Sequence, residues 1–145
     1  MIPWNDAKKT EYWRDDRVQD SIKSAKVHAS TAYCPYSKFH VGAVVLTAEG
    51  QIFGGCNIEN ASYGLTICAE RVALFRSWGR HNSVINDLFV YCADLPLQSP
   101  ITFTMPCGAC RQVMSEFMGS NSRVWVINFG LFTLSELLPH AFKLS

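Results

Sequence analysis

The stretch HVGAVVLTAEGQIFGGC, residues 40–56, determines the fold class. Most of residues 40–46 are apolar and several are β-branched, which is typical of a buried strand. Residues 47–50 supply a turn, and residues 51–56 predict a second strand that returns beside the first in a hairpin. A sheet therefore begins here, and the flanking segments indicate what covers it.

Helices and strands alternate around this hairpin. Apolar positions recur at helical spacing over residues 16–32, and Pro35 ends that helix because the residue before a proline disfavours helical backbone. Residues 69–76 predict a helix that stops before Gly79. The other expected elements are strands at 88–92, 124–128 and 129–133, a helix from Pro106 to 117 or 118, and a helix at 133–138 with Thr133 and Glu136 as a capping box. This alternation predicts an α/β fold, with a sheet of about five strands covered by helices.

Length and composition indicate one folded domain. The chain has 145 residues, of which 48% are hydrophobic, and this composition argues against disorder. We expect residues 1–15 to form a flexible or loosely docked N-terminal arm, followed by a single domain over residues 16–145.

The charge balance and the cysteines limit the possible partners and location. Thirteen basic and twelve acidic residues leave a net charge of +1, so no nucleic-acid partner and no anionic membrane surface is expected. No apolar run approaches the ~20 residues that span a bilayer, and the N-terminus lacks the apolar centre of a secretory signal. We therefore expect a cytoplasmic protein whose six cysteines are reduced, some of them bound to metal.

Two short segments carry the chemistry, Cys68-Ala69-Glu70 and Pro106-Cys107-Gly108-Ala109-Cys110. Catalytic zinc sites use three protein ligands and keep one position open for water, and Cys68, Cys107 and Cys110 supply that number. Both segments lie where helices are expected to begin, and helix N-termini stabilise thiolates. Three thiolates also bring a charge of −3, which a nearby cation would balance. Arg71 lies three residues after Cys68, on the same face of the expected helix, so we expect it to donate hydrogen bonds to the thiolates.

Glu70 is the expected proton carrier. Deamination of a cytosine ring needs water added at C4, a proton on N3 and a proton for the departing ammonia. One carboxyl beside the metal-bound water can carry out these proton transfers in sequence. A zinc set of three cysteines, a Glu two residues after the first ligand and a Pro-Cys-x-x-Cys segment are the pattern of base deaminases.

Each of these residues also has a plainer interpretation. The cysteines could form a structural zinc site closed by Cys34, Cys56, Cys92 or a histidine. Glu70 could merely stabilise a helix N-terminus, and Arg71 could form a surface salt bridge.

Through these motifs, the sequence resembles the small cytidine deaminases from about residue 18 to residue 142. The resemblance implies a three-layer fold around a mixed sheet, one Zn²⁺ per subunit, and hydrolytic deamination of cytidine and 2′-deoxycytidine in pyrimidine salvage. It also implies a homotetramer whose active sites are completed by neighbouring subunits. The matching segments are Cys34–Ala43, Gly55–Tyr63, Cys68–Arg71, Pro106–Val113 and Leu137–Phe142.

The same resemblance implies the substrate contacts. Phe39 would pack against the pyrimidine ring, and the backbone of Ala69 would bind its polar edge. Asn57 and Glu59 would hydrogen-bond the ribose 3′-hydroxyl, while Tyr63 and Phe142 match positions that the family uses across subunit interfaces.

The residues themselves agree with a sugar site. Asn57 and Glu59 alternate as the chain leaves a strand, so both can face one side, and an acceptor pair suits a hydroxyl but repels phosphate. Loop capping is the alternative for this pair, and core or interface packing is the alternative for the three aromatic residues.

Three other functions stay open at this stage. The same metal centre could deaminate a cytosine-nucleoside analogue such as an aminoacylnucleoside antibiotic. It could act on a polynucleotide, which would need a basic groove with stacking residues. The chain could also be a zinc-stabilised binding module with no activity.

Overall fold

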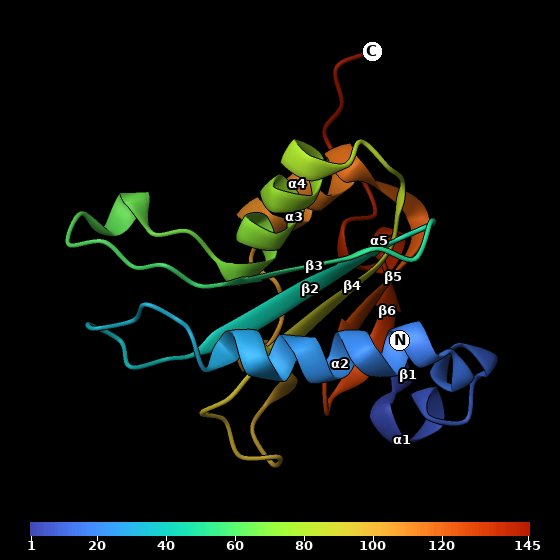
Figure 1. The fold of residues 1–145 in the computed structure, drawn as a ribbon, viewed down its shortest axis with the longest axis horizontal. Coiled ribbons are helices and arrows are strands. Elements are labelled where there is room, and N and C mark those ends of the chain that lie inside the picture. The colour runs from blue at the N-terminus through green and yellow to red at the C-terminus, as the bar shows by residue number, and fades with distance from the viewer.

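The computed structural model describes all 145 residues and contains one six-stranded sheet with helices on both faces (Figure 1). The helices are α1 (Trp4–Ala7), α2 (Asp16–Ala29), α3 (Ala69–Arg80), α4 (Gly108–Phe117) and α5 (Leu134–Leu137). The strands are β1 (Ile2–Pro3), β2 (Val41–Thr47), β3 (Ile52–Cys56), β4 (Ile85–Cys92), β5 (Met118–Val126) and β6 (Gly130–Thr133). Short 3₁₀ turns occur at Glu11–Arg14, Tyr63–Leu65 and Ile101–Phe103.

The sheet is mixed, with the strand order β1-β6-β5-β4-β2-β3. The predicted hairpin forms, with Ala43 opposite Gly55 and Val45 opposite Phe53. Only β4 and β5 run parallel, and α4 lies in the connection between them. The α/β class and the mixed sheet are therefore confirmed, with one strand beyond the expected five.

Alternation along the central strands divides the core into two layers. Side chains such as Val44, Phe89 and Trp125 face α2 and the N-terminal segment. Their neighbours, such as Val45 and Val90, face α3, α4 and α5 on the other side. Because successive strand residues point to opposite faces, fully buried apolar strands hold helices on both sides.

Gly42 lets α2 lie directly on β2. A Cβ atom at this position would be 2.0 Å from the carbonyl oxygen of Ala25 and 2.4 Å from the backbone nitrogen of Ala29. These are backbone atoms, so no side-chain movement could make room. The missing side chain therefore sets the distance between helix and sheet.

Helix ends differ from expectation in one place and agree in another. The prediction that the second helix stops before Gly79 is wrong, since α3 continues to Arg80. Gly79 has open space around it, and a helix tolerates an exposed glycine near its end at a cost of about 1 kcal/mol. The capping box of Thr133 and Glu136 is confirmed at the start of α5.

The first 15 residues pack more closely than a loosely docked arm. Ile2 pairs with Leu131 of β6, and the ring of Trp4 meets those of Trp13 and Trp125 edge-on. The N-terminal amine also forms an ion pair with Glu136. Burial of aromatic surface against β5 explains the difference, because this packing has no periodic signal in the sequence.

Three loops leave the same end of the sheet, two toward the left of Figure 1 and one toward the bottom. They are residues 30–40 before β2, residues 57–68 after β3, and residues 93–107 after β4. Loops at one end of a rigid sheet commonly carry functional residues, and here they surround the site. None of the helices combines the length and apolar character that crossing a bilayer requires.

Candidate active site

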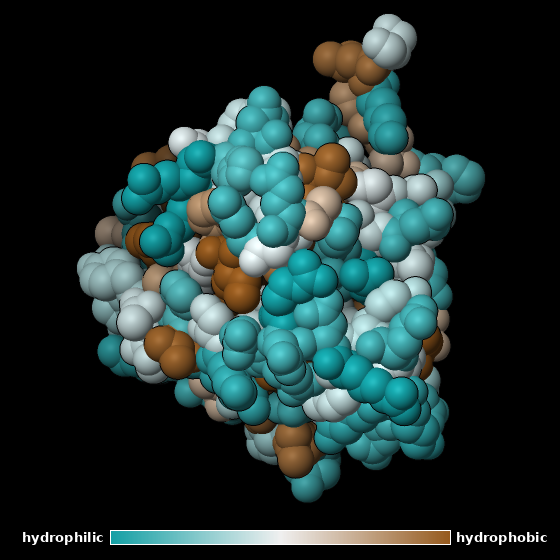
Figure 2. Space-filling model, turned by 45° about the vertical axis from the view of Figure 1, so that its right-hand side comes forward, coloured by the Kyte–Doolittle hydropathy of each residue, from teal (hydrophilic) through white to brown (hydrophobic).

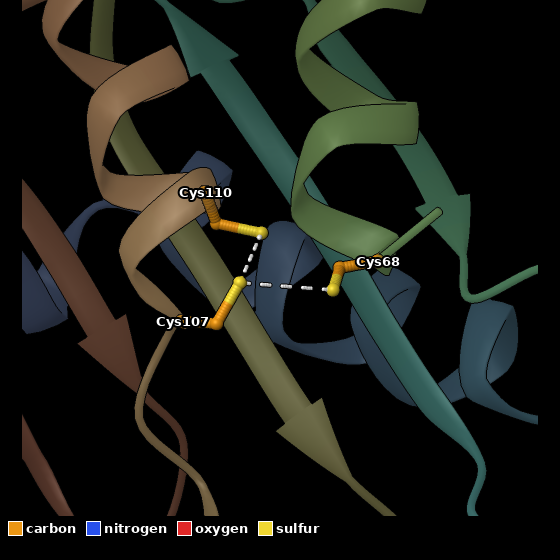
Figure 3. Close-up of side chains that lie close together, drawn as sticks. All are labelled: Cys68, Cys107 and Cys110. Atoms are coloured by element: carbon orange, nitrogen blue, oxygen red, sulfur yellow. Dashed lines mark hydrogen bonds between the residues drawn. The ribbon is translucent and has the colours of Figure 1, made fainter. Parts of the chain in front are cut away.

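Three thiols meet between the N-termini of α3 and α4 (Figure 3). Cys68 is the N-cap residue of α3, Cys107 is the N-cap residue of α4, and Cys110 lies in the first turn of α4. The Sγ atom of Cys107 lies 3.9 Å from that of Cys68 and 3.5 Å from that of Cys110. All three sulfurs lie within 4.8 Å of one another.

This donor set fits Zn²⁺. Zn–S bonds of about 2.3 Å in a tetrahedral site place neighbouring sulfurs about 3.8 Å apart, which agrees with the two Sγ separations around Cys107. Cys107 is exposed while Cys110 is buried, so the cluster has one side open to solvent. Cys34, Cys56 and Cys92 are not part of the cluster, nor is any histidine. A three-sulfur set with an open side is typical of catalytic zinc and not of a closed structural site.

The thiols lie in surroundings that favour a thiolate. Hydrogen bonds from Cys110 and then from Arg71 lower the pKa of the Cys68 thiol to about 5. The pKa of the Cys110 thiol is raised, because its proton is held in a hydrogen bond to the sulfur of Cys68 and because the thiol is buried. Both helix N-termini add positive potential to the cluster. Metal binding at this site would therefore release protons from the remaining thiols.

Arg71 is a cation in hydrogen-bond contact with one of these sulfurs. Its Nη2 atom donates to the Sγ atom of Cys68 at 3.6 Å, from one turn further along α3. The contact also raises the pKa of the Arg71 guanidinium. The hydrogen bond goes to a thiol and not to a surface carboxylate, in line with the predicted supporting role.

Glu70 is buried beside the thiols. It is only 5% exposed, and burial together with the charge of Cys68 raises the pKa of its carboxyl to about 7. A carboxyl with a pKa near 7 can both take up and release a proton at neutral pH. If Glu70 only stabilised the N-terminus of α3, which is the plainer interpretation, we would expect its carboxyl to be exposed to solvent rather than buried.

Glu70 and two of the thiols open into one cavity of about 240 Å³. Phe39, Asn57, Glu59 and Ala69 line the same cavity, so four of the expected substrate contacts lie around the metal cluster. Its other lining residues are Ser37, Val41, Thr66, Val90, Cys92, Phe103, Thr104 and Met105. The three loops and the ends of β2 and β4 thus build a single partly apolar site.

Asn57 and Glu59 are held by backbone groups of neighbouring segments. Asn57 is 8% exposed, accepts from the backbone N–H of Val41 at 2.9 Å and donates to the carbonyl oxygen of Phe39 at 2.7 Å. Glu59 accepts from the backbone N–H groups of Tyr36 at 2.9 Å and Ser37 at 3.3 Å. One amide hydrogen of Asn57 and one lone pair of Glu59 stay available, which matches the donor and acceptor of one hydroxyl.

Tyr63 and Phe142 lie outside this cavity. Tyr63 is 78% exposed on the long loop after β3 and contacts Tyr36 edge-on, with 6.2 Å between ring centroids. Phe142 is 68% exposed in the C-terminal tail, which projects from the body of the molecule (Figures 1 and 2). Within one chain, Tyr63 lines an adjoining hollow together with Ser37, Glu59 and Thr66, whereas Phe142 lines neither hollow.

Sequence reasoning assigned no role to Ser37 or Arg111. The hydroxyl of Ser37 donates to Glu59, and Arg111 donates to the carbonyl oxygens of Pro106 at 2.8 Å and Leu137 at 3.0 Å. Arg111 thereby ties the Pro106–Cys110 segment to the end of α5. Both residues stand inside the quoted motifs, but their partners lie more than 20 residues away or in the backbone, and no spacing rule identifies such partners.

Comparisons with known proteins agree on one family. Residues 16–127 match the family described as "Cytidine and deoxycytidylate deaminase zinc-binding region". The cytidine deaminase of Halalkalibacterium halodurans is 43% identical over 125 residues, covering 83% of this chain and 90% of that protein. That of Sporosarcina psychrophila is 41% identical over 130 residues, covering 87% and 91%. The crystal structure of cytidine deaminase from Burkholderia pseudomallei superposes with a TM-score of 0.75 at 39% identity, covering 86% of this chain and 98% of that one.

Proposed function

The chain belongs to the cytidine deaminase family, and on that basis we infer that it is a zinc-dependent enzyme that hydrolytically deaminates cytosine nucleosides. Cytidine becomes uridine and 2′-deoxycytidine becomes 2′-deoxyuridine, with release of ammonia. The observation that carries this function is the buried Glu70 carboxyl, which opens into the same cavity as Cys68 and Cys107.

The chain's own residues divide the chemistry between them. When bound, zinc supplies the activation of water at neutral pH. We propose that Cys68, Cys107 and Cys110 hold the zinc and that Arg71 balances their charge. Glu70 takes one proton from the attacking water and passes it to N3 as the C4–O bond forms. It then carries the second proton, from the new C4 hydroxyl, to the amino group, so that the C4–N bond breaks, ammonia leaves and the C4 carbonyl forms. One carboxyl with a pKa near 7 can perform these transfers in sequence.

Other cavity residues are proposed to orient the nucleoside. Phe39 packs against the pyrimidine ring, while the backbone of Ala69 binds the polar edge of the ring. The spare amide hydrogen of Asn57 and the spare lone pair of Glu59 bind the 3′-hydroxyl of the sugar. Because the negative charge of Glu59 lies at the sugar end, a phosphate there would be repelled, which favours nucleosides over nucleotides.

We also propose a homotetramer with shared active sites. Tyr63 and Phe142 are large, exposed side chains on a protruding loop and a projecting tail, where a neighbouring subunit can reach them. On the face that Figure 2 shows, apolar side chains also reach the surface in several small groups. The family match begins at residue 16, which supports a catalytic domain over residues 16–145 preceded by the segment 1–15.

Shared sites can be tested by mixing two inactive or weakened variants. Glu70→Gln lacks the proton carrier, and Phe142→Ala lacks the tail aromatic residue. If sites combine residues of two subunits, co-refolded mixtures regain activity beyond the sum of the separate variants. A monomer by light scattering, or no regained activity, would contradict the proposal.

A cytoplasmic location and a role in pyrimidine salvage complete the proposal. All six cysteines are free, and three of them must stay reduced to bind metal. The reaction returns a cytosine nucleoside to the uridine series, which is a salvage step.

The deciding experiment measures ammonia release by zinc-loaded protein from cytidine, 2′-deoxycytidine, cytidine monophosphate and free cytosine. Glu70→Gln, with its zinc content checked, is assayed in parallel. We expect turnover of the two nucleosides and a loss of at least about 10²-fold in kcat for the variant with zinc retained. Turnover only of an aminoacylnucleoside or of cytosine within an oligonucleotide would reassign the substrate.

A further inference from the structure

The hydroxyl of Ser37 links the side chain of Glu59 to the backbone of Phe39, two residues that line the substrate cavity. It donates to Oε1 of Glu59 and accepts from the backbone N–H of Phe39 at 3.1 Å. Ser37 itself lines the cavity, at the start of the short segment that leads into β2. One hydroxyl group therefore connects the proposed sugar ligand to the proposed ring contact.

The hydroxyl of Ser37 is the only group that accepts from the backbone N–H of Phe39, whose carbonyl oxygen is held separately by Asn57. Residues 35–38 are exposed, and Lys38 has a φ of 58°, a left-handed conformation that is uncommon outside glycine. The bond from Phe39 N–H to the Ser37 hydroxyl spans this residue, in the pattern of a serine turn. Without it, the backbone direction into Phe39 would be less well defined.

Glu59 depends on the same turn. Both of its carboxylate oxygens accept hydrogen bonds from residues 36 and 37, so the turn determines where its remaining lone pair points. The Ser37 hydroxyl is the strongest of the contacts that lower the pKa of Glu59. Residues 36 and 37 therefore both keep the Glu59 carboxylate ionised and fix its orientation.

We propose that Ser37 is a positioning residue for substrate binding, whose hydroxyl holds Glu59 and Phe39 in the geometry that binds the sugar 3′-hydroxyl together with the base. This inference rests on the proposed function, because it needs a nucleoside in the cavity. In this proposal Ser37 does not touch the substrate itself but acts through Glu59 and Phe39.

Steady-state kinetics of Ser37→Ala test the inference. We expect KM for cytidine to rise about tenfold, as for loss of one hydrogen bond to a charged group, while kcat changes far less. Ser37→Thr keeps the hydroxyl and should restore most of the affinity. Ser30→Ala is the matched control, since the exposed Ser30 hydroxyl bonds only to the carbonyl oxygen of Val27.

A substrate without the 3′-hydroxyl separates positioning from general damage. With 2′,3′-dideoxycytidine, Glu59 has no hydroxyl to bind, so Ser37→Ala should raise KM much less than it does with cytidine. Adding Ser37→Ala to Glu59→Gln should raise KM less than Ser37→Ala raises it in the wild-type protein, because the two changes share the Glu59 interaction and only the Phe39 contact is left to lose. Zinc content and thermal midpoint of each variant show that it is folded.

Two results would overturn the inference in distinguishable ways. If wild-type protein deaminates cytidine but Ser37→Ala keeps its KM, or loses affinity equally for both nucleosides, Ser37 does not act through Glu59. If wild-type protein neither binds nor deaminates cytidine, the proposed function fails and the role of Ser37 fails with it.

Discussion

Arg71 donates from Nη2 to the Sγ atom of Cys68 at 3.6 Å, from the first turn of α3 back to the N-cap residue of that helix. One guanidinium thus offsets part of the charge of three sulfurs. A hydrogen bond to a ligand atom both orients that ligand and tunes the electron density that it gives to the metal. We therefore expect activity at this site to depend on Arg71, although it need not touch the substrate.

Arg71→Met should weaken zinc binding by about 10–100-fold, the usual effect of removing a hydrogen-bond partner of a metal ligand. The change keeps side-chain bulk and removes the donor, and zinc competition with a chromophoric chelator measures the affinity. The sulfur-to-metal absorption of the cobalt-substituted protein should shift as well.

The matched control for this prediction is Arg76→Met on the same helix. Arg76 donates to the carbonyl oxygen of Gly54 at 3.0 Å and has no contact with the thiols. Equal zinc affinity in Arg71→Met and wild-type protein would show that the thiolates need no such partner.

Asp87→Asn should destabilise the fold by about 3–5 kcal/mol, the usual cost of breaking a buried charge pair. Asp87 is 1% exposed and accepts from Nε and Nη2 of Arg123 and from Nε1 of Trp125, at 2.6, 2.7 and 2.8 Å. An amide cannot accept from all three donors. Urea unfolding at a fixed protein and zinc concentration measures the loss.

Asp20→Asn serves as the comparison for Asp87→Asn. Asp20 pairs with Lys23 at 3.9 Å on the exposed face of α2, where such a pair contributes little. We expect a change within about 0.5 kcal/mol. If the two variants unfold at the same urea concentration, the Asp87 network does not support the sheet.

The parts of the fold that could be predicted from the sequence are those with local signals. The hairpin of β2 and β3 follows from an apolar run, a turn and a second run, and α5 follows from its capping box. The cysteine cluster follows in the same way, because Cys68 and Cys107 were expected at helix starts and both are N-cap residues.

Other features depend on contacts between distant segments. Strand β1 has two residues, Ile2 and Pro3, and exists only because β6 offers an open edge. The continuation of α3 through Gly79 to Arg80 goes against the low helix propensity of glycine, so propensity alone does not predict it. Likewise, the hydrogen-bond partners of Glu59 come from a turn more than 20 residues away, so the orientation of its carboxylate could not be predicted from local spacing.

Trp13→Ala should lower the unfolding free energy by about 3 kcal/mol while leaving the KM for cytidine unchanged. The Trp13 ring lies 5.3 Å from that of Trp4 and 6.3 Å from that of Trp125, between centroids, on the face of the sheet opposite the thiols. Trp78→Ala, at a half-exposed ring outside this cluster, should cost less. Equal stability of Trp13→Ala and wild-type protein would mean that the N-terminal segment is in fact loosely docked.

Two glycine-to-alanine changes should shift stability in opposite directions, because one site is closed and the other is open. At Gly42 the new methyl group would meet backbone atoms of α2, at 2.0 Å from the Ala25 oxygen, so α2 must move off the sheet. We expect Gly42→Ala to cost about 3 kcal/mol or to prevent folding. Gly79 lies in α3 with nothing near its Cβ position, so Gly79→Ala should stabilise the protein by about 0.5–1 kcal/mol through helix propensity. Chemical unfolding of both variants under one set of conditions decides, and a destabilised Gly79→Ala would show that α3 does not continue to Arg80 in solution.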